Sequence, residues 1–160
     1  MAWFSRPAPT HFPEVDGSRP DGTRVAIPAD LPADATVLVV SFREDLDAVS
    51  DQWARLVERL AAGYDGRLAV WETPVFGRAA RALDAIGSVM RDEVEPAETH
   101  RTVRLHADAG DLRKALGLRD ANTVAAFLVG RDGHIAWTGE DAVDLSEIAG
   151  LEAALAEMLG

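Results

Sequence analysis

The chain has 160 residues, of which 48% are hydrophobic and 27% charged; this suffices for one domain with a single core and excludes the disordered class. Its net charge of −11 argues against nucleic acids and anionic membranes as partners, because an acidic surface repels both. The absence of cysteine excludes disulfides, thiolate metal sites and every thiol-based reaction, including those of oxidoreductases and peroxidases.

The sequence contains neither a signal-peptide pattern nor the roughly 20 consecutive apolar residues of a transmembrane helix. We therefore expect a soluble, cytoplasmic protein without membrane insertion. Lys114 is the only lysine beside many arginines. Such an acid-rich, lysine-poor composition suggests a salt-adapted organism, although a high-GC genome also favours arginine.

The first half of the chain predicts a leader, a β-hairpin and a strand followed by a helix. We expect residues 1–11 to be a flexible leader and residues 12–160 to form a single domain. Asp-Gly turns at 16–17 and 21–22 precede a short strand at 23–27 and predict the hairpin. The apolar, β-branched run 36–42 is typical of a strand buried on both faces. The stretch after it carries one helical stripe of apolar residues: Leu46, Val49, Trp53, Leu56, Val57 and Leu60.

The second half alternates strands and helices. We predict strands at 67–73, 102–106, 123–129 and 134–138, helices at 76–91 and 111–116, and a loop at 92–100. Pro74 is expected to end the first of these strands. A final helix begins at the cap Asp144, with Glu147 completing a capping box, and buries Ile148, Leu151, Leu155, Met158 and Leu159. This order predicts an α/β fold whose mixed sheet is parallel at its start and antiparallel at its end, with helices on both faces.

Functional residues are expected in the loop 41–47, because the carboxyl end of a central strand is where open α/β sheets place their sites. The loop has no glycine that could cradle a phosphate, and we interpret Asp47 and Ser50 as helix-capping residues. The four histidines lie at 11, 100, 106 and 134, so none share the spacing of a local zinc pair, and surface or strand-edge positions are expected for them. A histidine–carboxylate site assembled in space would not be visible in the sequence. Acidic turns match no calcium loop, and nucleotide-binding and serine-hydrolase motifs are absent. The sequence therefore predicts no catalytic residue, no metal ligand and no cofactor.

Three segments, DGTRVAIP at 21–28, TVLVVSF at 36–42 and NTVAAFLVGRDGHIAWTGE at 122–140, resemble the thioredoxin-like superfamily. The resemblance implies a three-layer α/β/α sandwich. More narrowly, residues 100–142 resemble the mitochondrial ATPase-complex assembly factor ten family and its prokaryotic relatives, in KALG at 114–117, Asn122, FLV at 127–129 and IAWTG at 135–139. That family implies a chaperone-like helper in assembly of the ATP synthase membrane sector, and it supplies no catalytic residues.

The departures from these families concern the reactive positions. Asp47 and Ser50 lie roughly where the superfamily has its cysteines, and no proline is found near Thr123 or Val124, where a cis-proline would precede the penultimate strand. Ala136 replaces the arginine that the narrower family has in its "IRW" motif.

These observations favour a non-catalytic binding or assembly-factor-like protein whose partner is a protein or peptide segment. The binding groove that we predict is lined by Ser41, Phe42, Arg43, Glu44, Asp45, Leu46, Asn122, Thr123 and Val124. One alternative is a non-thiol enzyme that uses the carboxylates of Glu44, Asp45 or Asp47. Another is a homodimer in which the fold has a purely structural role.

Overall fold

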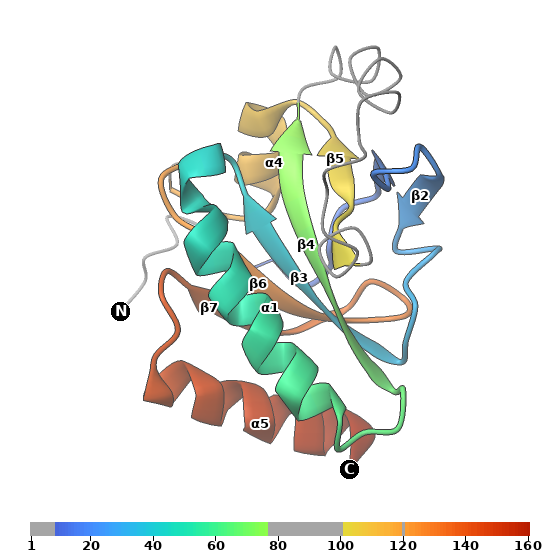
Figure 1. The fold of residues 1–160 in the computed structure, drawn as a ribbon, viewed down its shortest axis with the longest axis vertical. Coiled ribbons are helices and arrows are strands. Elements are labelled where there is room, and N and C mark those ends of the chain that lie inside the picture. Colours follow the sequence, from blue (N-terminus) through green and yellow to red (C-terminus); the bar gives the residue numbers. More distant parts are fainter. Residues whose placement is uncertain (1–8, 77–100, 120) are drawn as a thin grey trace.

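The structure is a computed structural model, and it describes residues 9–76, 101–119 and 121–160. Its strands form one seven-stranded sheet in the order β2-β1-β5-β4-β3-β6-β7 (Figure 1). The central strands β3 (Ala35–Ser41), β4 (Leu68–Phe76) and β5 (Arg104–His106) are parallel. The outer strands β1 (Val15–Ser18), β2 (Arg24–Ile27), β6 (Ala125–Gly130) and β7 (Ile135–Glu140) pair antiparallel. The mixed sheet and the N-terminal hairpin with its turn at 21–22 are therefore confirmed, whereas the predicted turn at 16–17 is wrong, because Asp16 and Gly17 lie in β1 and pair with β2.

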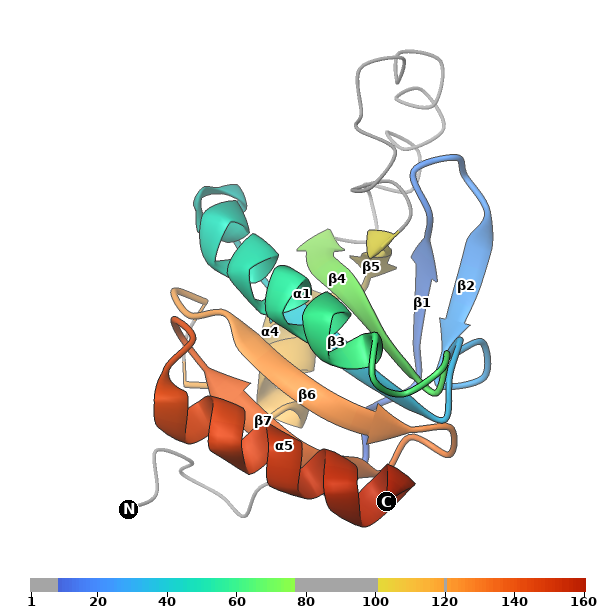
Figure 2. The ribbon, with the colours of Figure 1, turned by 60° about the horizontal axis from the view of Figure 1, so that its bottom comes forward.

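Helices cover both faces of the sheet, as predicted. The side chains of β3 alternate between the two faces of the sheet: Val37 and Val39 pack on one face, and Leu38 and Val40 pack on the other. The first face carries α1 (Asp47–Ala61) and α5 (Leu145–Leu159), whereas the second carries the short α4 (Ala109–Ala115). Figure 2 shows α4 on the side of the sheet away from α1. Every residue of β3 is buried, as its continuous apolar run predicts.

The strand β4 is longer than predicted, and this difference positions the site described below. Pro74 was expected to end the strand, yet β4 continues to Phe76 and Pro74 lies opposite Ser41 of β3. Proline removes one donor from the ladder, but the flanking carbonyls keep the pairing: Glu72 accepts from the Val103 amide at 2.9 Å, and Phe76 from that of Ala107 at 3.2 Å. The predicted helix 76–91 is wrong at Phe76, and the rest of it, like the loop 92–100, lies outside the described residues.

The start of the last helix agrees with the predicted capping box only in part. Asp144 is the N-cap and accepts a 2.8 Å hydrogen bond from the Glu147 amide, as expected. The Glu147 carboxylate, however, accepts from the Glu140 amide of β7 at 2.8 Å. It therefore ties the helix to the sheet. On the buried face of α5, Leu151, Leu155 and Leu159 are buried, whereas Ile148 and Met158 are half-buried.

Both outer edges of the sheet are partly covered by the chain itself. The outward backbone groups of Ala26 in β2 bond to Asp30, whose carboxylate accepts from the Ala26 amide and whose own amide donates to the Ala26 carbonyl, both at 2.8 Å. At the opposite edge, residues 10–12 pair with the start of β7: the Ile135 amide donates to Thr10 and the Phe12 amide to Gly133. Of the expected leader, Thr10 and His11 are thus held against the sheet.

Candidate functional site

A cavity of about 360 Å³ lies at the carboxyl ends of β3 and β4, beside the first turn of α1. The two parallel strands end side by side there, and the extension of β4 past Pro74 supplies one wall. The position matches the rule that open α/β sheets place their sites at the carboxyl ends of strands. The apolar lining consists of Pro20, Phe42, Pro74, Val75 and Phe76.

Five charged side chains also line the cavity: Arg43, Asp47, Asp51, Glu72 and Arg104. The Arg43 guanidinium donates to both carboxylate oxygens of Asp45, at 2.9 Å and 2.5 Å, and to the Asn122 side-chain oxygen at 2.6 Å. The Arg104 guanidinium lies over the Phe76 ring, 5.7 Å from its centroid. Both arginines thus have contacts within the protein, and Ser41, Ser50 and Thr102 add hydroxyl groups to the lining, so the cavity offers a ligand apolar surface together with polar groups.

Behind the cavity wall, Arg101 joins three carboxylates from α1 and β4. Its side chain is 8% exposed, and its guanidinium donates to Glu72 and Glu58 at 2.7 Å each and to Asp51. The second oxygen of Glu72 accepts from the Ser50 hydroxyl at 3.0 Å. A guanidinium presents its donors in a rigid fork, so this one residue fixes α1 against the end of β4. We call Arg101, Asp51, Glu58 and Glu72 the Arg101 network.

Two opposing effects act on the pKa of Arg101. Burial alone lowers it, because burial penalises the charged guanidinium, but the hydrogen bonds to Glu72 and Glu58 outweigh burial and raise the pKa above its ordinary value. Arg101 therefore remains charged, and its charge compensates carboxylates that line the cavity.

The structure places the residues of the predicted groove in different environments. Ser41, Phe42 and Arg43 line the cavity. Asp45 pairs with Arg43, and Leu46 is half-buried against the core between the sheet and α1. Glu44 belongs to the 3₁₀ turn η1 (Glu44–Leu46), and its side chain lies outside the description.

The second half of the predicted groove does not line the cavity. Asn122 meets Arg43 through the 2.6 Å hydrogen bond, so the two loops are in contact. The Thr123 hydroxyl donates to Glu140 at 3.4 Å, and Val124 is buried in the core beneath α1. The expected capping by Asp47 and Ser50 is wrong: Leu46 is the N-cap without a side-chain cap bond, and Ser50 points to Glu72 instead.

Sequence reasoning missed the Arg101 network, because the partners of Arg101 lie 29, 43 and 50 residues away along the chain. It also missed two contacts of histidines. The Ser18 hydroxyl and His106 Nε2 are 2.8 Å apart and both side chains are buried, so His106 lies at the end of a strand, as expected, but not on the surface. His11 and His134 lie side by side with ring centroids 5.5 Å apart. Within the described ranges, no three histidine, aspartate or glutamate side chains are grouped as a metal site.

Comparison with known proteins identifies the fold and no closer relationship. No family model and no curated protein matches the sequence. Among solved structures, a protein described as the thiol:disulfide interchange protein DsbE from Chlorobium tepidum is 16% identical, with a TM-score of 0.61 over 98% of this chain and 100% of that chain. BsSco, a member of the Sco family of cytochrome c oxidase assembly proteins, is 11% identical, with a TM-score of 0.60 over 98% of each chain. Yeast Sco1 with copper bound is 12% identical, with a TM-score of 0.56 over 96% of this chain and 94% of that chain.

The chain has a thioredoxin-like fold. At these identities the likeness shows the fold alone, and the narrower resemblance to the ATPase-complex assembly factor family is not shown. The thioredoxin-like fold places its reactive cysteines at the start of the first long helix. Here that stretch of α1 holds Asp47 and Ser50, which lie next to the cavity. Among the described helices, none has the length and apolar character needed to span a bilayer.

Proposed function

We propose that this protein is a non-catalytic binding protein that holds an extended segment of a partner protein in the cavity between β3, β4 and α1. The observation that carries the proposal is the composition of the cavity wall. Five of its side chains are apolar, three carry hydroxyl groups (Ser41, Ser50 and Thr102), and Arg43, Asp51 and Glu72 form hydrogen bonds with the protein's own groups. Such a wall suits an extended peptide, whose apolar side chains and backbone groups find both apolar contacts and hydrogen-bond partners there.

Within this proposal, a role in assembling a membrane-bound complex is the finer hypothesis. It rests on the resemblance of residues 100–142 to the ATPase-complex assembly factors and on the naming of the Sco neighbours as cytochrome c oxidase assembly proteins. Both arguments are analogies between proteins of one fold. Neighbouring genes for ATP synthase or cytochrome assembly would support the hypothesis.

The proposal is tested by selecting peptides that bind the full chain from a random library and measuring their affinity for two variants. Phe76→Asp places a charge in the apolar wall and is expected to weaken binding at least tenfold. Leu145→Asp is the matched control, because Leu145 is 84% exposed and does not line the cavity. Equal affinity of both variants for every selected peptide would place binding elsewhere and contradict the proposal.

The alternative enzyme would use Glu44, Asp45 or Asp47 as an acid or base. Asp45 is 60% exposed in its side chain and forms an ion pair with Arg43, which is not the dry surrounding that a catalytic carboxyl needs. The homodimer alternative is tested by light scattering, because a molar mass equal to that of a single chain would exclude it.

A further inference from the structure

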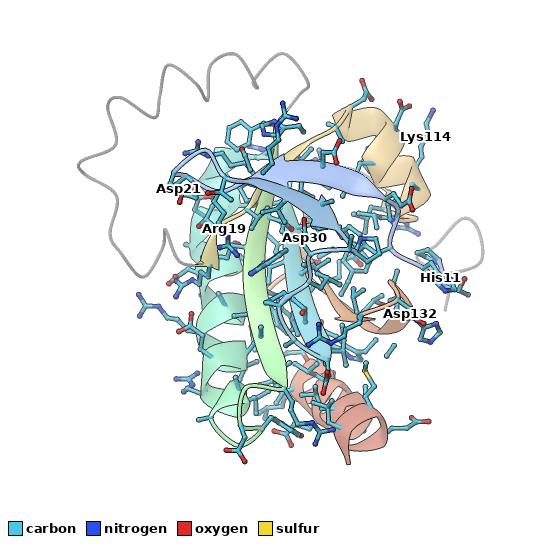
Figure 3. The ribbon with its side chains drawn as sticks, turned by 90° about the vertical axis from the view of Figure 1, so that its right-hand side faces the viewer. His11, Arg19, Asp21, Asp30, Lys114 and Asp132 are labelled. Atoms are coloured by element: carbon cyan, nitrogen blue, oxygen red, sulfur yellow. The ribbon has the colours of Figure 1, made fainter. Side chains whose placement is uncertain are left out.

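The two exposed histidines at the end of the sheet opposite the cavity lie in a geometry that favours metal binding. Gly130 of β6 pairs with Ala35 at the start of β3, and His134 follows the turn after Gly130. The cavity lies at the other end of β3, beside Ser41. His11 and His134 are therefore independent of the proposed peptide site. His11 lies at the outer edge of the molecule in Figure 3, as does Asp132.

Backbone pairing brings the two histidines together. His11 and His134 form an antiparallel bridge. The hydrogen bonds on either side of it, from the Ile135 amide to Thr10 and from the Phe12 amide to Gly133, are both 2.8 Å long. This pattern makes His11 and His134 a non-hydrogen-bonded pair, the kind in which opposite side chains lie on the same face and come closest.

The distance between the rings suits a shared ion. Two imidazoles that bind one ion, each through a nitrogen at about 2.0–2.1 Å, have ring centres roughly 5 Å apart. The observed separation is 5.5 Å at an interplanar angle of 74°, close to that spacing. Both side chains are exposed, so binding requires no opening of the core.

The residues around the two histidines orient the ring of His11 and place a negative charge beside the pair. Thr10 Oγ1 lies 3.2 Å from His11 Nδ1. If Nδ1–H donates to this hydroxyl, the lone pair remains on the outer nitrogen Nε2. The Asp132 carboxylate accepts from the His134 amide at 3.0 Å. This places a carboxylate beside the pair, where its negative charge favours a cation.

We propose that His11 and His134 together bind one divalent transition-metal ion of the imidazole-preferring group, such as Zn²⁺, through one nitrogen each, with water in the remaining positions. The ligand set is two imidazoles, because no group of three suitable side chains occurs in the described part of the chain. A bound ion would join residues 10–12 to the β6–β7 hairpin and thereby stabilise the folded state.

The test is calorimetric titration of the untagged full chain, freed of metal, with Zn²⁺ alone. We expect one ion per chain for the wild type and at least tenfold weaker binding for His11→Gln and for His134→Gln. His106→Gln is the matched control, which removes a buried imidazole at the end of β5 and is expected to leave the affinity unchanged. Circular dichroism confirms that each variant is folded.

Two further measurements complete the test. Zn²⁺ is expected to raise the unfolding temperature of the wild type but not that of His134→Gln. With Cu²⁺ as a second probe, electron paramagnetic resonance is expected to show coupling to two imidazole nitrogens in the wild type. Absence of binding by the wild type, or equal binding by wild type and His134→Gln, would overturn the proposal.

Discussion

Removing the guanidinium of Arg101 is expected to destabilise the protein far more than removing an exposed arginine that contacts one of the same carboxylates. In Arg101→Met, the side chain keeps most of its apolar length but loses its three hydrogen-bond contacts. The carboxylates of Asp51, Glu58 and Glu72 then lose their shared partner. The matched control is Arg55→Met, because Arg55 also pairs with Asp51 but is 72% exposed.

The magnitude follows from how deeply each carboxylate is buried. Breaking a buried ion pair by removing one partner costs about 3–5 kcal/mol. Glu58 is 49% exposed and regains solvation, and Asp51 keeps Arg55, so the main penalty falls on Glu72, which is 13% exposed. We therefore expect a loss near the lower limit, about 3 kcal/mol in the free energy of unfolding. The control should lose less than about 1 kcal/mol, as is usual for exposed pairs.

The assay is equilibrium unfolding in urea, with the free energy extrapolated to zero denaturant. A double variant, Arg101→Met with Glu72→Gln, should recover about 1.5 kcal/mol, because a neutral amide still accepts from Ser50 without an uncompensated charge. A loss below about 1 kcal/mol in Arg101→Met, or no recovery in the double variant, would refute the reasoning that an unpaired buried carboxylate sets the cost.

Three further changes test other parts of the fold. Gly150→Ala in α5 should lower the free energy of unfolding by about 1–3 kcal/mol, because the new Cβ would lie 2.9 Å from Trp137 Nε1. Helix propensity alone would predict the opposite, since alanine favours a helix more than glycine does. The control is Ala153→Gly on the exposed side of α5, which should lose about 1 kcal/mol. Burial raises the pKa of the Glu147 carboxyl above its ordinary 4.5. The protonated carboxyl therefore stabilises the fold fully below pH 4.5, and this contribution is lost as the pH rises through the raised pKa. Glu147→Gln, which can still accept from the Glu140 amide, should be at least as stable as the wild type in urea unfolding at pH 7, and lower stability there would contradict this account. Molar salt should raise the melting temperature by screening the net charge of −11, and a flat response would also remove the salt-adaptation hypothesis.

The sequence predicted those elements whose apolar pattern fits one kind of secondary structure and one mode of burial. The run at 36–42 had to be buried on both faces, and the strand lies at Ala35–Ser41. The prediction failed at Pro74, where tertiary pairing on both sides of the strand outweighs the loss of one donor. It also failed at Ser50, where a carboxylate of the neighbouring strand offers a better partner than the backbone of its own helix.

The candidate site was less accessible to prediction than the fold. Loops 41–46 and 122–124 were predicted to line one groove, and the Arg43–Asn122 hydrogen bond joins them across 79 residues of sequence. The sequence did not show which side chains face the cavity. The role of Arg101 depends on carboxylates from two other elements, and the contact of His11 with His134 depends on pairing between residues 10–12 and a distant hairpin. No local motif marks either cluster.

The covered edges of the sheet have a consequence for how this protein can associate with others. A strand from another chain cannot extend the sheet at Ala26, since Asp30 already occupies both of its outward groups, and residues 10–12 take the corresponding place beside the start of β7. Self-association by continuous sheets, the route to fibrils and to many dimers, is thereby discouraged at both borders. A second molecule is thereby directed away from these two places, towards surfaces where its side chains contribute to recognition and where selectivity for its sequence can arise.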